Sequence, residues 1–337
     1  MKRISIALVV VLVVMCLGTT GYAQAPPAPA PTKPTAAPKV DFPTKGKTIT
    51  LIVPWAPGGA ADVGARLLAD GLEKALKVPV RVVNMAGASG QVGLSELVIR
   101  SKPDGYTLGL TIFASTITTY LDPVRKAVFT RDSFVPVALQ VSDPAVVCVN
   151  VDSPHKNLKD LVDAAKAKPW TVGTGTGGLM TTEHLALLQL EQVSGAKFNP
   201  VHLNGSAQAM TTLLGGHVDA IGSLVSQVLG PFKARQIRVL AVFDREQSKF
   251  LPAVPTAESQ GFMVHAGAFR GFSAPAGTPK EIVEILSAGI RKAMESEQMK
   301  RKMEESGQGL RFMDAAQYTA LWAKTEAQIK PLMSLAK

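Results

Sequence analysis

Strand-like runs alternate with helical runs along the chain, and this alternation limits the fold more than any other feature. Residues 49–53 and 80–83 have the apolar pattern of strands, and residues 61–76 between them have that of a helix. A strand, a helix and a second strand in this order predict a parallel sheet covered by helices. The pattern continues with a helix near 92–100 and a strand at 106–112. The predicted fold class is therefore α/β.

A second block of alternating strands and helices follows, and a chain of 337 residues is long enough for two domains. We predict two doubly wound domains with a hinge and a cleft between them. The crossing strands are expected near 141–149 and 264–272. The first domain is predicted to hold residues 45–145 and 268–337, and the second residues 146–267.

The first 25 residues have the order of an export signal. Two basic residues precede an apolar run at 4–17, which is shorter than the ~20 residues that a membrane-spanning helix needs. Ala23-Gln24-Ala25 then offers a small-x-small cleavage site, so residues 1–25 are predicted to be a cleaved signal peptide and the mature protein to be periplasmic. Residues 26–44 are mostly Pro and Ala and predict an extended tether.

Charge and cysteine content exclude several classes of protein. Loss of Lys2 and Arg3 with the signal lowers the formal charge by two, from +10 to +8. The basic residues are scattered, with the densest group at 300–302, and aromatic residues do not interleave with them, so nucleic acid is not the expected partner. The mature chain keeps only Cys148, in an apolar run, and so has no internal disulfide.

A glycine-rich loop joins the first predicted strand to the helix that follows it. Such a loop exposes main-chain N–H groups at the positive end of a helix dipole, where an anion is stabilised. The alternative is an ordinary tight turn in which the acidic residue caps the helix or pairs with Arg66. The candidate ligand-binding residues here are Trp55, Gly58, Gly59, Ala60 and Asp62.

A second glycine-rich loop, residues 84–90, follows the next predicted strand and contains Ser89. Ser115 comes just after the third predicted strand. Ligands of open α/β sheets bind outside the carboxyl ends of the strands, so these residues are expected at one edge with the first loop. We include Ser89 and Ser115 among the ligand-binding candidates.

In the second block, residues 173–178 read GTGTGG after a strand predicted at 170–173. The segment matches the dinucleotide fingerprint GxGxxG. The favoured interpretation is instead a second wall of the cleft, in which hydroxyl and N–H groups meet the far end of the ligand. The candidates for this wall are Thr174, Thr176, Thr181, Asn204, Ser206 and Asp219, although Asn204 and Ser206 also suit a turn and a helix cap, and Asp219 also suits a bond to a main-chain amide.

Catalytic patterns are missing from the sequence. It contains no GxSxG, HExxH, CxxC or GxxxxGK, and its five histidines lack metal-ligand spacing. His184 on an amphipathic helix is expected to be a core or surface residue. The sequence predicts no enzyme activity, no metal and no cofactor.

The motifs resemble those of the Bug-type, TctC-like extracytoplasmic solute receptors of tripartite tricarboxylate transporters. The likeness covers about residues 45–332. Its carriers are VPWAPGGAADVGAR at 53–66, Asn84 with residues 87–93, KPDGYTL at 102–108, the loop at 173–178, LNGSAQAMTTLLGGHVDA at 203–220, VPTAESQGF at 254–262 and FRGFSAPAGTPKEI at 269–282.

The resemblance implies a type II periplasmic-binding-protein fold that closes on one small carboxylate and delivers it to membrane subunits, with the receptor itself a monomer. It implies ligand contacts from the loops at 55–62 and around Ser89, Thr176, Thr181 and Ser206. Trp55 departs from the family, which commonly has a smaller aromatic residue there. The alternatives are a periplasmic NAD-dependent oxidoreductase, a hydrolase and a ligand sensor. The sequence does not distinguish C4 dicarboxylates, citrate, acidic amino acids and aromatic carboxylates as ligands.

Overall fold

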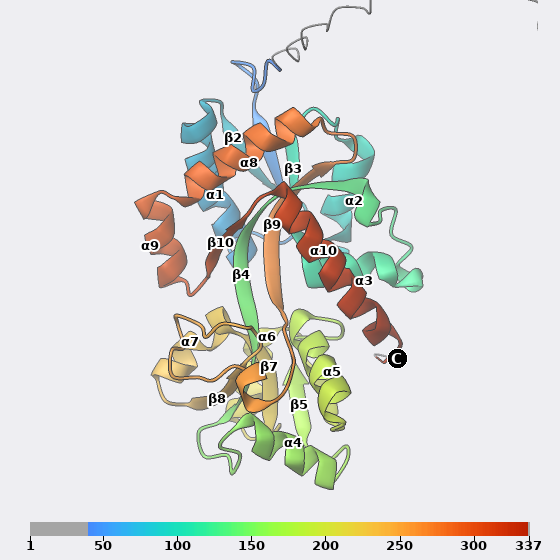
Figure 1. Cartoon of the computed structure of the whole chain (residues 1–337), viewed down its shortest axis with the longest axis vertical. Helices are drawn as coiled ribbons and strands as arrows, with labels where there is room; N and C mark the ends of the chain where they lie inside the picture. The colour runs from blue at the N-terminus through green and yellow to red at the C-terminus, as the bar shows by residue number, and fades with distance from the viewer. Residues whose placement is uncertain (1–39, 336–337) are drawn as a thin grey trace, which may run out of the picture. The chain divides into compact units, whose positions relative to one another are not determined.

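One long strand, β4 (Phe134–Asn150), organises the computed structural model, which describes residues 40–335. Residues 134–144 of β4 pair with β9 (Gly267–Pro275), and residues 145–150 pair with β7 (Ala220–Leu224) and β8 (Ile237–Val242). The strand therefore belongs to two sheets. Figure 1 shows β4 beside β9 and continuing towards β7 and β8.

The first sheet is built on the amino-terminal half of β4. It contains β1 (Ile49–Val53), β2 (Val80–Asn84), β3 (Thr107–Ile112), β9 and β10 (Leu310–Met313). β1 pairs in parallel with both β2 and β3, as the alternating pattern predicts, whereas β9 runs antiparallel to β3 and β4.

Helices cover both faces of this sheet (Figure 1). The helices are α1 (Ala60–Leu76), α2 (Gln91–Arg100), α3 (Phe113–Leu121), α8 (Lys280–Met294), α9 (Glu297–Glu305) and α10 (Ala315–Ile329). One core joins α1, α8 and α9 through residues such as Leu72 and Ile290, and the other joins α2, α3 and α10 through residues such as Phe113 and Trp322.

The second sheet is built on the rest of β4. It adds β5 (Gly173–Thr176) and β6 (Asn199–His202) to β7 and β8, and its helices are α4 (Leu158–Ala167), α5 (Thr182–Ser194), α6 (Ser206–Leu214) and α7 (Val225–Lys233). One core contains residues of α4 and α5, and the other contains residues of α6 and α7. The α/β class predicted from the sequence is confirmed, with two mixed sheets that share β4.

The predicted strand at 170–173 is displaced in the structure. β5 begins at Gly173, and the Gly-Thr alternation forms the strand itself rather than the loop after it. Both threonines of β5 are buried, and a Cβ at Gly175 would lie 3.0 Å from Ile221, so the neighbouring strand packs closely here. Small residues therefore suit this interior strand.

Several sequence predictions lie outside these observations. The proposed signal peptide, and the tether up to residue 39, fall outside the described residues. The domain boundaries also stay a prediction. No helix within residues 40–335 is long and apolar enough to cross a membrane.

Candidate functional site

The loop after β1 presents main-chain N–H groups at the start of α1. Gly59 is the N-cap of α1, has an extended backbone, and receives no capping bond from a side chain. Gly58, Gly59 and Ala60 are all exposed. Because the first N–H groups of a helix have no partner within the helix, this turn can donate to an anion. The loop thus has the property that the sequence predicts.

Asp62 holds this loop from beneath. Its carboxylate accepts hydrogen bonds from the Gly58 N–H at 2.9 Å, from Arg66 Nε at 3.0 Å and from Asn84 Nδ2 at 2.9 Å. Burial raises the pKa of Asp62, but the bonds from Arg66, Gly58 and Asn84 outweigh burial and lower it to about 2. Asp62 is 2% exposed, so the geometry gives it the structural role that was the alternative to ligand contact.

The second glycine-rich loop lies against the first. The Trp55 ring packs so closely on Gly90 that a Cβ there would lie 3.1 Å from Cζ2 of the ring. Asn84 joins the loops, since its Nδ2 donates both to the Trp55 carbonyl and to Asp62. Ser89 is exposed and has a left-handed backbone, with φ of 56°. The structure therefore brings Trp55 and Ser89 to one edge of the sheet.

Ser115 lies in the first turn of α3 and is half-buried. It follows β3, whose carboxyl end lies beside that of β1 in the parallel pair. α3 also contacts the turn that carries Ser89. Ser115 thus joins the same edge, as predicted from its position after the third strand.

Three of the second-sheet candidates gather where β5 and β6 end. Thr176 is the last residue of β5, and its hydroxyl contacts His202 Nδ1 at 3.1 Å. Thr181 is the N-cap of α5 and accepts a bond from the His184 N–H. Ser206 begins α6, and a Cβ at Gly177 would lie 3.1 Å from its N and Oγ atoms. Asn204, whose N–H donates to Gln208 Oε1, is exposed in the loop before α6.

Two candidates lie apart from this group. Thr174 is 1% exposed and sits inside β5, paired on both sides by neighbouring strands. Asp219 precedes β7 and accepts a bond from the N–H of Gly173, the first residue of β5, at 2.7 Å. At about 3.3 Å of rise per residue, the opposite end of β5 lies about 10 Å from the Thr176 end. The structure does not bring Asp219 to the loops because it lies at the amino edge of the sheet.

Glu183 and His202 lie beside the second-sheet loops and were not singled out from the sequence, whereas His184 next to them was expected to be a core or surface residue and is buried. The two imidazole rings meet edge to face with centroids 4.4 Å apart, and His184 Nδ1 accepts a bond from the Met180 N–H. Burial, with repulsion from His202 second, lowers the pKa of His184 to about 4, and burial also lowers the pKa of His202. His184 is therefore a neutral, buried acceptor at pH 7 and does not supply positive charge.

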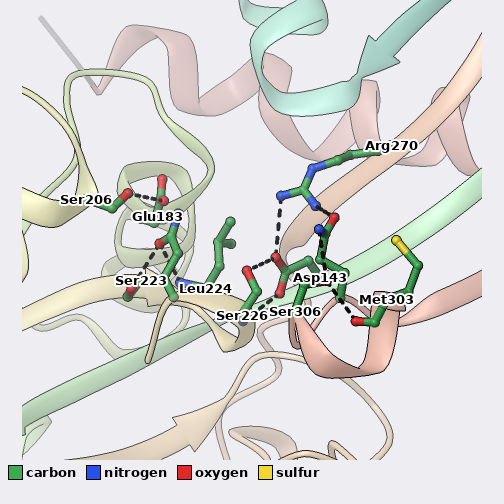
Figure 2. Close-up of polar contacts among 11 residues, drawn as sticks. Asp143, Glu183, Ser206, Ser223, Leu224, Ser226, Arg270, Met303 and Ser306 are labelled. Atoms are coloured by element: carbon green, nitrogen blue, oxygen red, sulfur yellow. Dashed lines mark hydrogen bonds and ion pairs between the residues drawn. The ribbon is translucent and has the colours of Figure 1, made fainter. Parts of the chain in front are cut away.

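A buried polar cluster lies next to these loops, where β4 passes from one sheet to the other. Asp143 accepts bonds from the Ser226 N–H at 3.1 Å and the Ser226 hydroxyl at 2.6 Å, and Arg270 Nη2 lies 3.4 Å from it. Arg270 Nη1 also donates to Gln308 Oε1. Figure 2 shows Ser226 and Arg270 converging on Asp143, and Ser206 pointing towards Glu183. This cluster ties β4, β9 and α7 together.

Neither a metal site nor a reactive thiol emerges from the described residues. Within residues 40–335, no group of three or more His, Cys, Asp or Glu side chains is placed to hold a metal ion. Cys148 is fully buried, and burial raises the pKa of its thiol to about 12. Its environment is that of a structural residue.

The chain is similar to a known receptor family. The sequence profile of the tripartite tricarboxylate transporter family receptors, TctC, matches residues 64–336. Protein BugT of Bordetella pertussis is 32% identical over 252 residues, which cover 74% of this chain and 77% of BugT.

Solved structures show the same likeness. A TctC solute binding protein from Polaromonas is 30% identical with a TM-score of 0.79, over 87% of this chain and 99% of that one. MatC from Rhodopseudomonas palustris with bound malate has a TM-score of 0.70 over 87% of this chain and 100% of that one, and at 24% identity the likeness is one of fold. These comparisons confirm the resemblance seen in the sequence and the predicted fold class.

Proposed function

Because the chain belongs to the family of tripartite tricarboxylate transporter receptors, we propose that it captures one small organic carboxylate by closing two domains over it. The carboxylate would dock first on the loop at Gly58, Gly59 and Ala60. The loops around Thr176, Thr181 and Ser206 would reach the ligand only in the closed form. A ligand that gains contacts only on closure shifts the hinge equilibrium towards the closed state.

The observation that carries this proposal is the exposed, uncapped start of α1, held in place by Asp62. A hydrogen bond to a charged group contributes about 1.5–3 kcal/mol. Three or four such bonds supply the roughly 8 kcal/mol of a micromolar site. The carboxylate would be bordered by Trp55, Ser89 and Ser115. The malate bound to the structural neighbour MatC supports a carboxylate as the ligand.

The cellular role that we propose follows the family. Residues 1–25 would direct export, residues 26–44 would remain as a tether, and the monomeric receptor would deliver its ligand to membrane subunits in the periplasm. We propose no catalytic role. The dinucleotide interpretation is not favoured because the first glycine of the fingerprint, Gly173, is a strand residue and not a turn residue.

The loop can be tested with one pair of variants. Gly59 has φ of −75°, which proline can adopt, so Gly59→Pro removes the N–H while the φ angle is kept. Gly59→Ala keeps the N–H, and its Cβ would make only an ordinary contact of 3.9 Å with the Ala56 oxygen.

A thermal-shift panel of mono-, di- and tricarboxylates would first identify a ligand, and calorimetry would then compare the two variants. Loss of one charge-assisted bond predicts at least a tenfold weaker affinity for Gly59→Pro and little change for Gly59→Ala. Equal affinities of the two variants would remove this loop from the proposed site.

A further inference from the structure

Glu183 is a buried carboxyl beside the second-sheet loops, and no basic side chain neutralises it. It lies in the first turn of α5 and is 5% exposed. Its carboxyl accepts a bond from the Ser206 hydroxyl at 3.4 Å, a long distance for such a bond. Within residues 40–335, no salt bridge involves Glu183. A buried acid without a cation is costly unless it holds a proton or finds a donor.

The groups that face Glu183 do not supply positive charge. α6 contributes the Ser206 hydroxyl, and β7 packs so closely that a Cβ at Gly222 would lie 3.2 Å from the Glu183 Cβ. On α5 itself, Thr181 contributes a hydroxyl and the adjacent His184 is neutral at pH 7.

The charged groups where β4 and β9 cross between the sheets do not supply Glu183 with a free positive charge either. β4 contributes Asp143, a second acid, whose charge adds to the effect of burial in raising the pKa of Glu183. Arg270 on β9 is already engaged by Asp143 and Gln308. The groups around Glu183 are therefore acceptors and hydroxyls.

This environment discriminates between two kinds of ligand. A second ionised carboxylate at the far end of a ligand would enter a desolvated region that already contains two acids, and like charges there repel strongly. An ammonium group would instead give Glu183 the positive charge that no salt bridge in residues 40–335 supplies, and an amide N–H would add a donor to the hydroxyls of Thr181 and Ser206. Both ligands could place their first carboxylate on the Gly59 loop.

We propose that Glu183 sets the ligand class of this receptor, which prefers carboxylates whose far end carries an N–H donor over dicarboxylates. The inference rests on the proposed function, because it takes the Gly59 loop as the site of the first carboxylate. Glu183 acts as a specificity-determining residue that contacts the far end of the ligand.

The test is a matched series of acids measured by calorimetry at pH 7.5. At four carbons the series is butyrate, succinate, succinamate and 4-aminobutyrate, and equivalent sets at three, five and six carbons cover other spacings. At the length that binds best, wild-type protein is expected to bind the amide or ammonium acid at least tenfold more tightly than the dicarboxylate. This ranking decides the inference even if no variant folds.

Glu183→Gln provides the second readout, since it keeps the shape and adds a donor for a carboxylate. The ratio of the affinity for succinamate to the affinity for succinate should be at least tenfold smaller in this variant than in wild type. Glu191→Gln is the matched control: Glu191 lies two turns further along α5, is 9% exposed, and accepts a bond from the Phe198 N–H. This control should keep the wild-type ranking.

Three outcomes would overturn the inference. The first is a wild-type preference for the dicarboxylate, and the second is an unchanged ranking in Glu183→Gln. The third is dicarboxylate binding whose change from pH 7.5 to 5.5 is the same in wild type and in Glu183→Gln, because protonation of Glu183 should relieve the repulsion of the second carboxylate in wild type alone. If none of these acids binds, the proposed function fails as well, whereas tight binding with the opposite ranking leaves the proposed function standing.

Discussion

Asp143 and Glu183 are two buried acids that lie close to one another but have different partners (Figure 2). Asp143 is fully buried and receives two bonds from Ser226 and an ion pair from Arg270. Glu183 is 5% exposed and receives one long bond from Ser206. Burial raises the pKa of both side chains. The charge of Arg270 opposes this effect at Asp143, whereas at Glu183 only hydrogen bonds from its own N–H and from the Thr181 and Ser206 hydroxyls oppose it. Asp143 therefore stabilises the region where β4 passes between the sheets, whereas Glu183 lacks a cationic partner within residues 40–335 and can bind one from a ligand.

The largest expected effect comes from removing the partner of Asp143. Arg270→Met leaves a buried carboxyl with only Ser226, and breaking a buried pair in this way costs about 3–5 kcal/mol. Urea unfolding should therefore show a large loss of stability. Arg66→Met is the control, because Arg66 has a side chain that is 52% exposed and its ion pair with Asp62 is open to solvent. A loss for Arg270→Met no greater than for this control would contradict the role given to the cluster.

Asp62, beside the first sheet, is a third buried acid, and like Asp143 it has a basic partner and hydrogen-bond donors. Its pKa is lowered. Asp62→Ala removes three accepted bonds, and at about 1 kcal/mol net for each the loss of stability is about 2–3 kcal/mol. The Gly59 amide would also lose its support, so carboxylate affinity should fall at least tenfold.

The pH dependence of the Asp62 effect has a definite sign. Since the folded pKa of about 2 lies below the usual aspartate value of 3.8, the stabilisation from this carboxylate is present above pH 4 and is lost as the pH falls through 2. Melting curves of wild type and Asp62→Asn should converge over this range. If the difference in melting temperature between wild type and Asp62→Asn stayed constant down to pH 2, the charge of Asp62 would not contribute to stability.

Local signals were sufficient to predict the first sheet and its loops. The apolar alternation placed β1, β2 and β3 within about one residue. The backbone of Gly59 and the position of Ser89 follow from the same order of strand, loop and helix. These features depend on residues that are neighbours in the sequence, so periodicity and turn chemistry are enough.

Features that depend on packing between distant segments were not predictable. β5 is made of glycine and threonine, and only its position between β6 and β7 shows that it is a strand. Asp219 was placed with the ligand loops, but it lies just before β7, where its carboxylate accepts a bond from the Gly173 N–H. Nothing in the sequence marks Glu183, since its burial arises when α5 meets α6 and β7.

The smallest expected effect on stability is that of Glu183→Gln. The substitution replaces a buried acid that has no cation with a neutral amide of the same shape, so it should cost little stability, in contrast to Arg270→Met. We expect the free energy of unfolding to stay within about 1 kcal/mol of wild type, with any change at pH 7 towards greater stability.

The difference in the free energy of unfolding between wild type and Glu183→Gln should depend on pH, because only wild type has a titrating group at this position. Burial raises the folded pKa of Glu183 above the usual glutamate value of 4.5, so the folded state holds its proton more tightly than the unfolded state. Wild type should therefore lose stability relative to Glu183→Gln as the pH rises above 4.5 towards the folded pKa, the opposite direction to the effect of Asp62. Urea unfolding at several pH values checks the sign. If Glu183→Gln instead destabilises the protein as much as Arg270→Met, then Glu183 is a structural acid like Asp143, and the contrast between them disappears.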